Sequence, residues 1–255
     1  MKTGQTIGSF FELGSCNAIE CLARTGLDYI VIDFEHGCFS DESAANYIRA
    51  AENTGLIPYV RISDTRRASV LRMLDIGARG LIVPNITSME QVCELVSHGK
   101  FPPVGNRGYC PTRTSGWGQD KWSKEIHSYM AECNQRCLMI PQCETKEALE
   151  QIEEIAALEG VDGIFVGPCD LSISLGSPWK WMRRSFSVPS RGCWRPARNT
   201  VKSHIYSLDL RRMRRNGWRP DLTVSFAAWM PPFWPMPIKP PLRHASQINR
   251  KGYLS

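Results

Sequence analysis

Tyr29-Ile30-Val31-Ile32-Asp33-Phe34-Glu35-His36-Gly37 is the stretch around which the rest of the chain can be interpreted. Its four apolar residues, three of them β-branched, run directly into Asp33, Glu35 and His36. A short apolar run without polar alternation is typical of a strand covered on both faces in a parallel sheet. Two carboxylates and an imidazole are costly to bury without a task, and the rim of such a sheet suits acid–base or metal chemistry. The stretch therefore predicts one corner of a catalytic site.

From residue 5 to residue 178, apolar runs alternate with segments of helical character, which predicts β-strands alternating with α-helices. Such alternation favours a parallel sheet with right-handed crossovers. The predicted strands are Ile7–Leu13, Tyr29–Asp33, Ile57–Arg61, Gly80–Pro84, Cys137–Gln142 and Val161–Val166. The predicted helices are Asn17–Thr25, Asp41–Asn53 (with Ser40 or Asp41 as N-cap), Arg66–Ile76, Ser88–Ser97, Lys121–Cys133 and Lys146–Leu158.

Polar side chains that could carry chemistry follow strand after strand, namely Glu35 and His36, Arg61, Glu144 and Asp170. This favours a TIM-type (β/α)8 barrel, whose active site lies at the C-terminal ends of its strands. In an open doubly wound sheet the ligand sits mainly at one switch point. The chain contains no Gly-x-Gly-x-x-Gly or Walker loop that would support nucleotide binding. We expect residues 1–178 to form six βα units of an α/β barrel that carry the site.

The composition changes abruptly near Trp179. Residues 1–178 contain 15 Lys and Arg against 23 Asp and Glu, whereas residues 179–255 contain 16 against 2, so the net charge changes from −8 to +14. The last segment also holds six of the eight Trp and nine of the 17 Pro. Six prolines within Ala227–Leu242 exclude a helix interior or a central strand there. The printed tail therefore does not predict the last two βα units of a barrel.

A shifted reading frame would explain this change. When permissive codons are read from the third base of each triplet, Trp229–Pro240 can encode D-A-A-V-L-A-N-A-Y-K-A and Thr200–Leu208 can encode G-K-I-S-Y-I-F-A-G. The hidden frame alternates helix and strand, as the two missing units would. We expect residues 179–255 to be an out-of-frame, poorly ordered basic tail. The alternatives are a disordered in-frame extension and an RNA-binding arm of interleaved Arg and aromatic residues.

Ten cysteines at irregular spacings, Cys133 and Cys137 among them, predict reduced thiols rather than a zinc site or a disulfide framework. No run of about 18 apolar residues is present, and no apolar signal core follows Met1. We expect a cytoplasmic protein with neither a membrane nor a nucleic-acid partner.

Six stretches together resemble the HpcH/HpaI aldolase family, the metal-dependent class II pyruvate aldolases. They cover about residues 5–178 in order, and the resemblance ends after Pro178. The stretches are Ile32-Asp33-Phe34-Glu35-His36-Gly37, Val60-Arg61, Leu74-Asp75-Ile76-Gly77-Ala78, Phe101-Pro102-Pro103-Val104-Gly105-Asn106-Arg107-Gly108, Pro141-Gln142-Cys143-Glu144-Thr145-Lys146-Glu147-Ala148, and Gly160-Val161-Asp162-Gly163-Ile164-Phe165-Val166-Gly167-Pro168-Cys169-Asp170-Leu171-Ser172.

The resemblance implies reversible aldol cleavage of a 4-hydroxy-2-oxo acid to pyruvate and an aldehyde. It implies a divalent metal, Mg²⁺, Mn²⁺ or Co²⁺, held by Glu144 and Asp170, which would chelate the 2-oxo acid and stabilise the pyruvate enolate. By spacing alone, Asp170 would more simply be a helix N-cap. Arg61 would orient the substrate carboxylate and the enolate. His36, paired with Asp33, would deprotonate the aldol hydroxyl, and Glu35 would support the water network around the metal.

The resemblance also implies that Asp75 reaches the site of a neighbouring subunit in a trimer or hexamer, although Asp75 could simply end its helix. Gln142 would bind near the metal, the Gly167–Cys169 backbone, which includes Pro168, would hold the substrate carboxylate, and Arg107 would meet the aldehyde half. Lys121 and Lys146 are weaker candidates for a class I Schiff base, because neither ends a strand. A citrate-lyase-type enzyme acting on acyl-CoA, an inactive aldolase-like chain and a basic-tail interaction protein remain as alternatives.

Overall fold

The computed structural model describes residues 6–178 and three short strands at 194–196, 206–208 and 223–225. Its strands are β1 (Gly8–Phe11), β2 (Tyr29–Asp33), β3 (Ile57–Arg61), β4 (Gly80–Val83), β5 (Leu138–Cys143), β6 (Gly163–Val166), β7 (Trp194–Pro196), β8 (Tyr206–Leu208) and β9 (Thr223–Ser225). Its helices are α1 (Cys16–Ala23), α2 (Asp41–Thr54), α3 (Arg67–Ile76), α4 (Met89–Gly99), η1 (Arg113–Gly118), η2 (Lys121–Ser123), α5 (Ile126–Arg136), α6 (Lys146–Glu150), α7 (Ile152–Ala157) and α8 (Pro168–Ser174).

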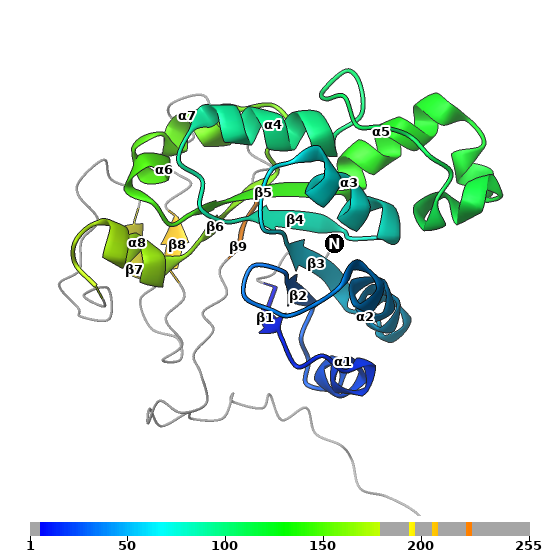
Figure 1. Cartoon of the computed structure of the whole chain (residues 1–255), viewed down its shortest axis with the longest axis horizontal. Helices are drawn as coiled ribbons and strands as arrows, with labels where there is room; N and C mark the ends of the chain where they lie inside the picture. The colour runs from blue at the N-terminus through cyan, green and yellow to red at the C-terminus, as the bar shows by residue number, and fades with distance from the viewer. Residues whose placement is uncertain (1–5, 179–193, 197–205, 209–222, 226–255) are drawn as a thin grey trace, which may run out of the picture.

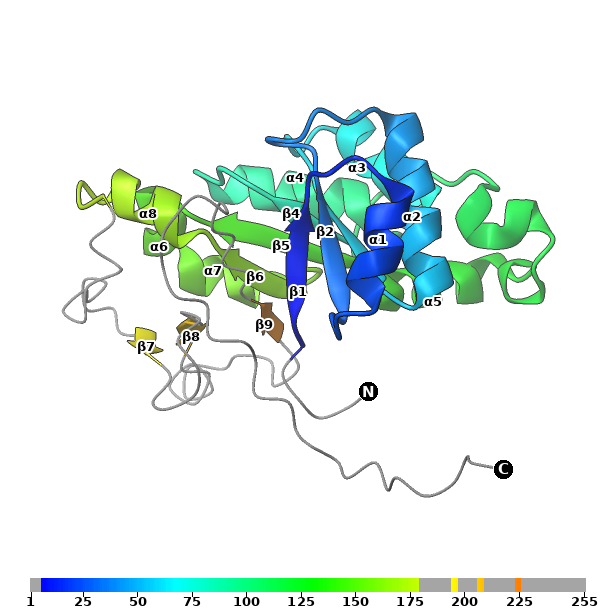
Figure 2. The same cartoon turned by 90° about the horizontal axis from the view of Figure 1, so that it is seen from below.

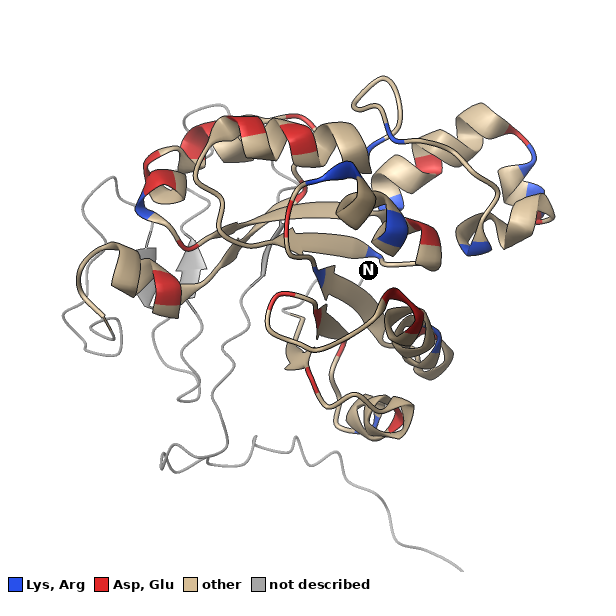
Figure 3. Cartoon of the chain, in the orientation of Figure 1, with Lys and Arg blue, Asp and Glu red and all other residues tan. Residues whose placement is uncertain are grey.

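Strands β1 to β6 lie side by side in sequence order and pair in parallel, with helices covering the outer face of the curved sheet (Figures 1 and 2). Acidic residues occur in the outer helices α4, α6 and α7 (Figure 3). The chain therefore has an α/β fold whose parallel sheet is a half-barrel of six strands, consistent with the predicted TIM-type architecture.

Alternate residues of each strand pack on opposite sides of the sheet. The outer side forms the larger buried cluster beneath the helices and includes Ile30, Ile32, Val60, Leu81 and Val166. The inner side forms a second cluster, in which Phe10 and Tyr59 pack against Tyr29, Val31, Ile82, Ile140 and Phe165. A side chain that continues the inner rows beyond the strand ends therefore lies at the mouth of the half-barrel.

Strands β2 and β3 have the predicted bounds, and Ser40 rather than Asp41 is the N-cap of α2. The helix predicted at Lys121–Cys133 starts only at Ile126, because the Glu125 side chain caps it by accepting from His127 N and Ser128 N. The helix predicted at Lys146–Leu158 is interrupted at Gln151. Helix α8 is not among the predicted helices, and Pro168 at its first position favours a helix start.

The printed tail adds one short strand to the sheet, because β9 pairs with β6 in parallel. Strands β7 and β8 form a separate antiparallel pair. The rest of residues 179–255, including Ala227–Leu242 and most of the segment predicted to be out of frame and poorly ordered, lies outside the described residues. Among the helices that are described, none has the length and apolar character needed to cross a membrane.

Candidate active site

The strand ends of β2, β3 and β5 bring most of the predicted site residues to one rim of the sheet. Asp33 pairs in register with Arg61, and both continue the inner rows that contain Val31 and Tyr59. Gln142 continues the inner row of β5 two residues beyond Ile140. Because parallel strands have their carboxyl ends at the same edge, these side chains face a common space.

Arg61 holds Asp33 by a two-point contact. Its Nε donates to Asp33 Oδ1 at 2.8 Å and its Nη2 donates to Oδ2 at 2.6 Å. Asp33 is fully buried, and the Arg61 side chain is 9% exposed. Burial would raise the pKa of Asp33, but the hydrogen bonds and charge of Arg61, helped by the backbone N–H groups of Glu35 and His36, lower it below its ordinary value. Asp33 is therefore the ionised partner of a buried pair, and Arg61 keeps N–H donors on both Nη atoms for a ligand.

Glu35 and His36 lie on the other side of the Arg61 guanidinium. Arg61 Nη1 lies 2.9 Å from Glu35 Oε2, and His36 Nε2 lies 4.0 Å from the same oxygen. Burial raises the pKa of Glu35, and the charges of Arg61 and His36 offset this only in part. The expected pairing of the imidazole with Asp33 is not what the geometry shows. Asp33 Oδ1 accepts from the backbone N–H of His36 at 3.4 Å, while the largely exposed ring faces Glu35.

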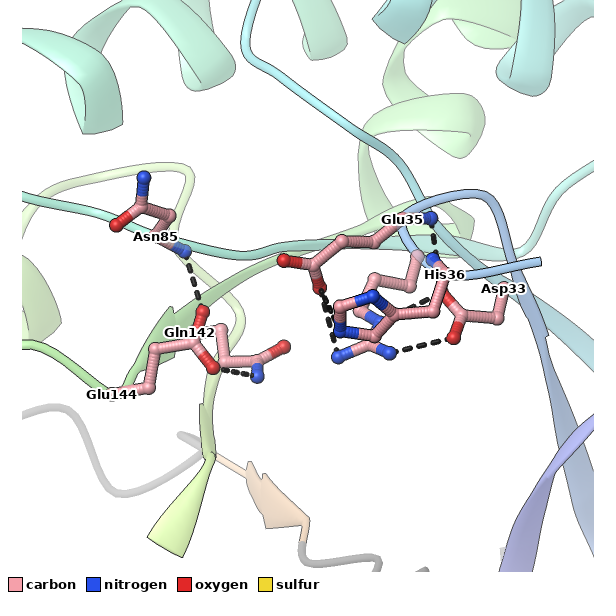
Figure 4. A network of polar contacts seen from close by, with 7 residues as sticks. Asp33, Glu35, His36, Asn85, Gln142 and Glu144 are labelled. Atoms are coloured by element: carbon pink, nitrogen blue, oxygen red, sulfur yellow. Dashed lines mark hydrogen bonds and ion pairs between the residues drawn. The ribbon is translucent and has the colours of Figure 1, made fainter. Parts of the chain in front are cut away.

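Glu144 and Gln142 form the facing half of the site, and the Glu35 carboxyl is directed toward them (Figure 4). Glu144 Oε1 accepts from the backbone N–H of Asn85 at 2.6 Å, and Oε2 accepts from the side-chain amide of Gln142. Burial raises the pKa of Glu144 to about 7, and the charges of Glu35 and Asp170 contribute to the increase. Gln142 Oε1 is buried and accepts no hydrogen bond from the described residues.

Helix α8 brings Gly167, Cys169 and Asp170 to the same side as Glu144. Gly167 is the N-cap of α8, so Asp170 lies in the first turn rather than at the N-cap itself. A Cβ atom at Gly167 would come within 2.6 Å of Glu144 Oε2 and 2.9 Å of Glu144 Cβ, so a side chain at this position would displace Glu144. Asp170 is exposed, whereas Cys169 and Pro168 are half-buried.

The donors on β5 and α8 suit a hard divalent cation. Glu144 and Asp170 supply carboxylate oxygens, and Gln142 Oε1 is a further buried oxygen without a hydrogen-bond donor among the described residues. The mutual repulsion of Glu35, Glu144 and Asp170 would be relieved by a positive charge. No cluster of three or more His, Cys, Asp or Glu that could hold a metal ion occurs in the described part of the chain.

Asp75 and Arg107 contact each other rather than the residues above. Asp75 lies in the last turn of α3, and Arg107 Nη2 donates to its Oδ1 at 2.9 Å. Burial raises the pKa of Asp75, and Arg107 opposes the increase. The Arg107 guanidinium also lies 4.9 Å from the centre of the Phe101 ring. Within one chain, therefore, neither residue is brought to the rim at which Arg61 and Glu144 meet.

Two residues that contact the site were missed. Glu12 is exposed, and the pKa of its carboxyl is raised by partial burial and then by the charge and hydrogen bond of Asp33. Glu12 directly follows the apolar strand β1, and this position could have indicated a site residue. The predicted strand Ile7–Leu13 was too long and placed Glu12 inside the strand. Asn85, with a left-handed φ of 52°, donates its backbone N–H to a carboxylate 59 residues away, and no local pattern indicates such a contact.

Comparisons with known proteins cover most of the described residues. The family described as HpcH/HpaI aldolase/citrate lyase matches residues 6–186. A 2-keto-3-deoxy-L-rhamnonate aldolase from Klebsiella pneumoniae is 35% identical over 178 residues, which are 69% of this chain and 64% of that protein. One from Salmonella gallinarum is 34% identical over 181 residues, or 70% of this chain and 66% of that protein. The chain thus spans less than two thirds of the length of these relatives.

Two solved structures share the fold of the described half-barrel. The HpcH/HpaI aldolase from Desulfitobacterium hafniense is 31% identical, with a TM-score of 0.65 over 71% of this chain and 68% of that one. The citrate synthase SbnG is 32% identical, with a TM-score of 0.62 over the same shares of the two chains.

Proposed function

This chain belongs to the HpcH/HpaI aldolase/citrate lyase family, and we propose that it is a metal-dependent aldolase. The reaction would be the reversible cleavage of a 4-hydroxy-2-oxo acid to pyruvate and an aldehyde. The observation that carries the proposal is that the buried Arg61 lies at the same rim of the sheet as the carboxylates of Glu144 and Asp170. The charge of Glu144 helps to raise the pKa of Arg61, and the charges of Glu35 and Asp170 help to raise the pKa of Glu144.

Glu144 and Asp170 would hold the divalent ion, which we propose to be Mg²⁺, Mn²⁺ or Co²⁺. When bound, such an ion supplies Lewis-acid stabilisation of negative charge that develops on the 2-oxo group. Gln142 would orient the ligand beside it, and the backbone of Gly167, Pro168 and Cys169 would lie against the substrate carboxylate.

Arg61 would orient the substrate. Asp33 fixes its guanidinium at two points, and the Phe10 ring lies 4.5 Å from Cζ, so the cation cannot turn freely. A guanidinium held in this way is preorganised for the carboxylate and for charge that appears during bond cleavage.

His36 would accept the proton of the 4-hydroxyl group. Its ring is accessible, and Glu35 Oε2 lies 4.0 Å from its Nε2. A neighbouring carboxylate favours the imidazolium that forms as the hydroxyl loses its proton.

Two further proposals concern the assembly. We propose a homo-oligomer, a trimer or hexamer, in which Asp75 and Arg107 lie near the site of a neighbouring subunit. Arg107 Nε is buried and has no hydrogen-bond partner in the described part of the chain, so this cation has capacity for one more acceptor.

Pyruvate release from a 4-hydroxy-2-oxo acid, followed with a lactate dehydrogenase coupling assay, tests the proposed activity. Release should require Mn²⁺, stop in EDTA and return when Mn²⁺ is added in excess. Glu144→Gln should lower the rate by about 100-fold or more, because it removes one of two metal carboxylates. Glu150→Gln is the matched control, since Glu150 is exposed on α6 and its carboxylate lies 3.8 Å from Lys146 Nζ. Release that persists in EDTA would overturn the metal-dependent mechanism.

A further inference from the structure

Glu12 occupies the position on β1 that corresponds to Asp33 on β2. The two strands pair in parallel with Phe11 opposite Ile32, so the next residues, Glu12 and Asp33, are level with each other. Phe10 belongs to the inner cluster and Phe11 to the outer cluster, which directs Glu12 to the inner side at the mouth of the half-barrel. The contact between the Glu12 and Asp33 carboxyl groups agrees with this direction.

Two carboxyl groups in hydrogen-bond contact need a proton between them, because two acceptors alone repel each other. Asp33 is the ionised member. Its oxygens accept two hydrogen bonds from Arg61 and two from backbone N–H groups, all of which favour its charged form. The proton therefore belongs to Glu12, whose O–H can donate to Asp33.

The proton on Glu12 affects the net charge around Arg61. Asp33 and Glu35 already contact the guanidinium, so one cation faces two carboxylates. A third carboxylate at Glu12 would make the site more negative just where an anionic 2-oxo acid must bind. Protonated Glu12 contributes a hydrogen bond without that charge.

We propose that Glu12 is a positioning residue of the aldolase site, which as a neutral acid donates a hydrogen bond to Asp33 and limits the negative charge beside Arg61. This role rests on the proposed function, because it concerns the binding of a 2-oxo acid. Ionisation of Glu12 would weaken the binding of that anion.

The groups facing Glu12 come from three elements. Asp33 lies on β2, Arg61 on β3, and His36 in the segment that follows β2. Partial burial, and then the charge and hydrogen bond of Asp33, raise the pKa of Glu12, while Arg61 and His36 act in the opposite direction.

Infrared difference spectra of the full chain test the proton directly. The spectrum of wild type minus Glu12→Gln should show the C=O stretch of a protonated carboxyl group at pH values where an ordinary glutamate, with a pKa of about 4.3, is ionised. Glu20→Gln on the exposed surface of α1 is the control and should remove no such band.

Pyruvate binding with excess Mn²⁺, measured by calorimetry between about pH 5 and about pH 9, tests the consequence. The dissociation constant of wild type should rise roughly two- to fivefold as Glu12 ionises, the size expected for one added charge at an exposed site. Glu12→Gln keeps a donor but cannot ionise, so this rise should be lost. Near-UV circular dichroism of both variants checks that they fold as wild type does.

The outcomes separate the two proposals. Absence of the carboxyl band, or an equal pH-dependent rise in wild type and Glu12→Gln, overturns the role of Glu12 while the aldolase proposal stands. Presence of the band without pyruvate binding in wild type overturns the proposed function, and with it the effect of Glu12 on substrate.

Discussion

Asp33 is the residue on which the geometry of the site depends. Its carboxylate accepts two hydrogen bonds from Arg61 and one each from the backbone N–H groups of Glu35 and His36. One buried side chain therefore positions the cation, the second carboxylate and the imidazole together. Its role is structural and electrostatic at the same time.

Asp33→Asn should destabilise the fold by about 3–5 kcal/mol at neutral pH, because it leaves the buried Arg61 guanidinium without its anion. The folded-state pKa of Asp33 lies below the unfolded value of about 3.9, so its stabilisation is present above that value and is lost as pH falls through the folded value. Urea unfolding at several pH values should show that the difference in the free energy of unfolding between wild type and variant becomes smaller in acid.

Asp64→Asn is the matched control for that measurement. Asp64 also pairs with an arginine, Arg66 at 2.5 Å, but the Arg66 side chain is 79% exposed. Exposed pairs contribute little, so the control should change stability far less. A loss of the same size in both variants would contradict the role assigned to burial.

At the scale of elements, α2 shows how local chemistry sets the bounds of a helix. Ser40 Oγ accepts from Ser43 N at 3.2 Å, and Ser43 Oγ accepts from Ser40 N at 2.9 Å. Gly55, with φ of 83°, ends the helix in the left-handed conformation that glycine adopts readily. The helix lies between β2 and β3, so its bounds fix the length of the connection that follows Glu35 and His36.

Ser40→Ala should lower the free energy of unfolding by about 1 kcal/mol, because it leaves an N–H group of the first turn without its side-chain acceptor. Thermal and urea unfolding both report this loss. Ser63→Ala is a suitable control, since Ser63 is exposed and outside any described helix. If the two variants unfold alike, the capping interaction contributes nothing to the stability of the fold.

At the scale of the whole molecule, the half-barrel is the dominant feature. β1 pairs only with β2 among the described strands, and the inner apolar cluster faces the space that further strands of a closed barrel would fill. Closure removes sheet edges and buries inner residues on every side. The reading frame hidden in residues 179–255 would encode the two βα units that close the barrel.

The nucleotide sequence across codons 176–182 and beyond should encode the hidden helix–strand pattern without a stop codon. In a chain in which this frame replaces residues 179–255, the free energy of unfolding should fall more steeply with urea concentration than in the present chain. The reason is that a closed barrel exposes more surface on unfolding. Stop codons in the hidden frame, or an unchanged slope for the replaced chain, would contradict the frame shift.

The sequence by itself determined the alternation of strands and helices, the bounds of β2 and β3, and the rim at which the site residues lie. These depend on local apolar patterns and on the fact that parallel strands share the edge at which they end. Only the tertiary structure decided which side chains interact. The His36 ring lies beside Glu35 rather than Asp33, and Arg107 donates to Asp75. The Asn85 backbone donates to Glu144, and Asp33 affects the carboxyl of Glu12. Those contacts depend on strand register and side-chain direction across many residues, which no local pattern specifies.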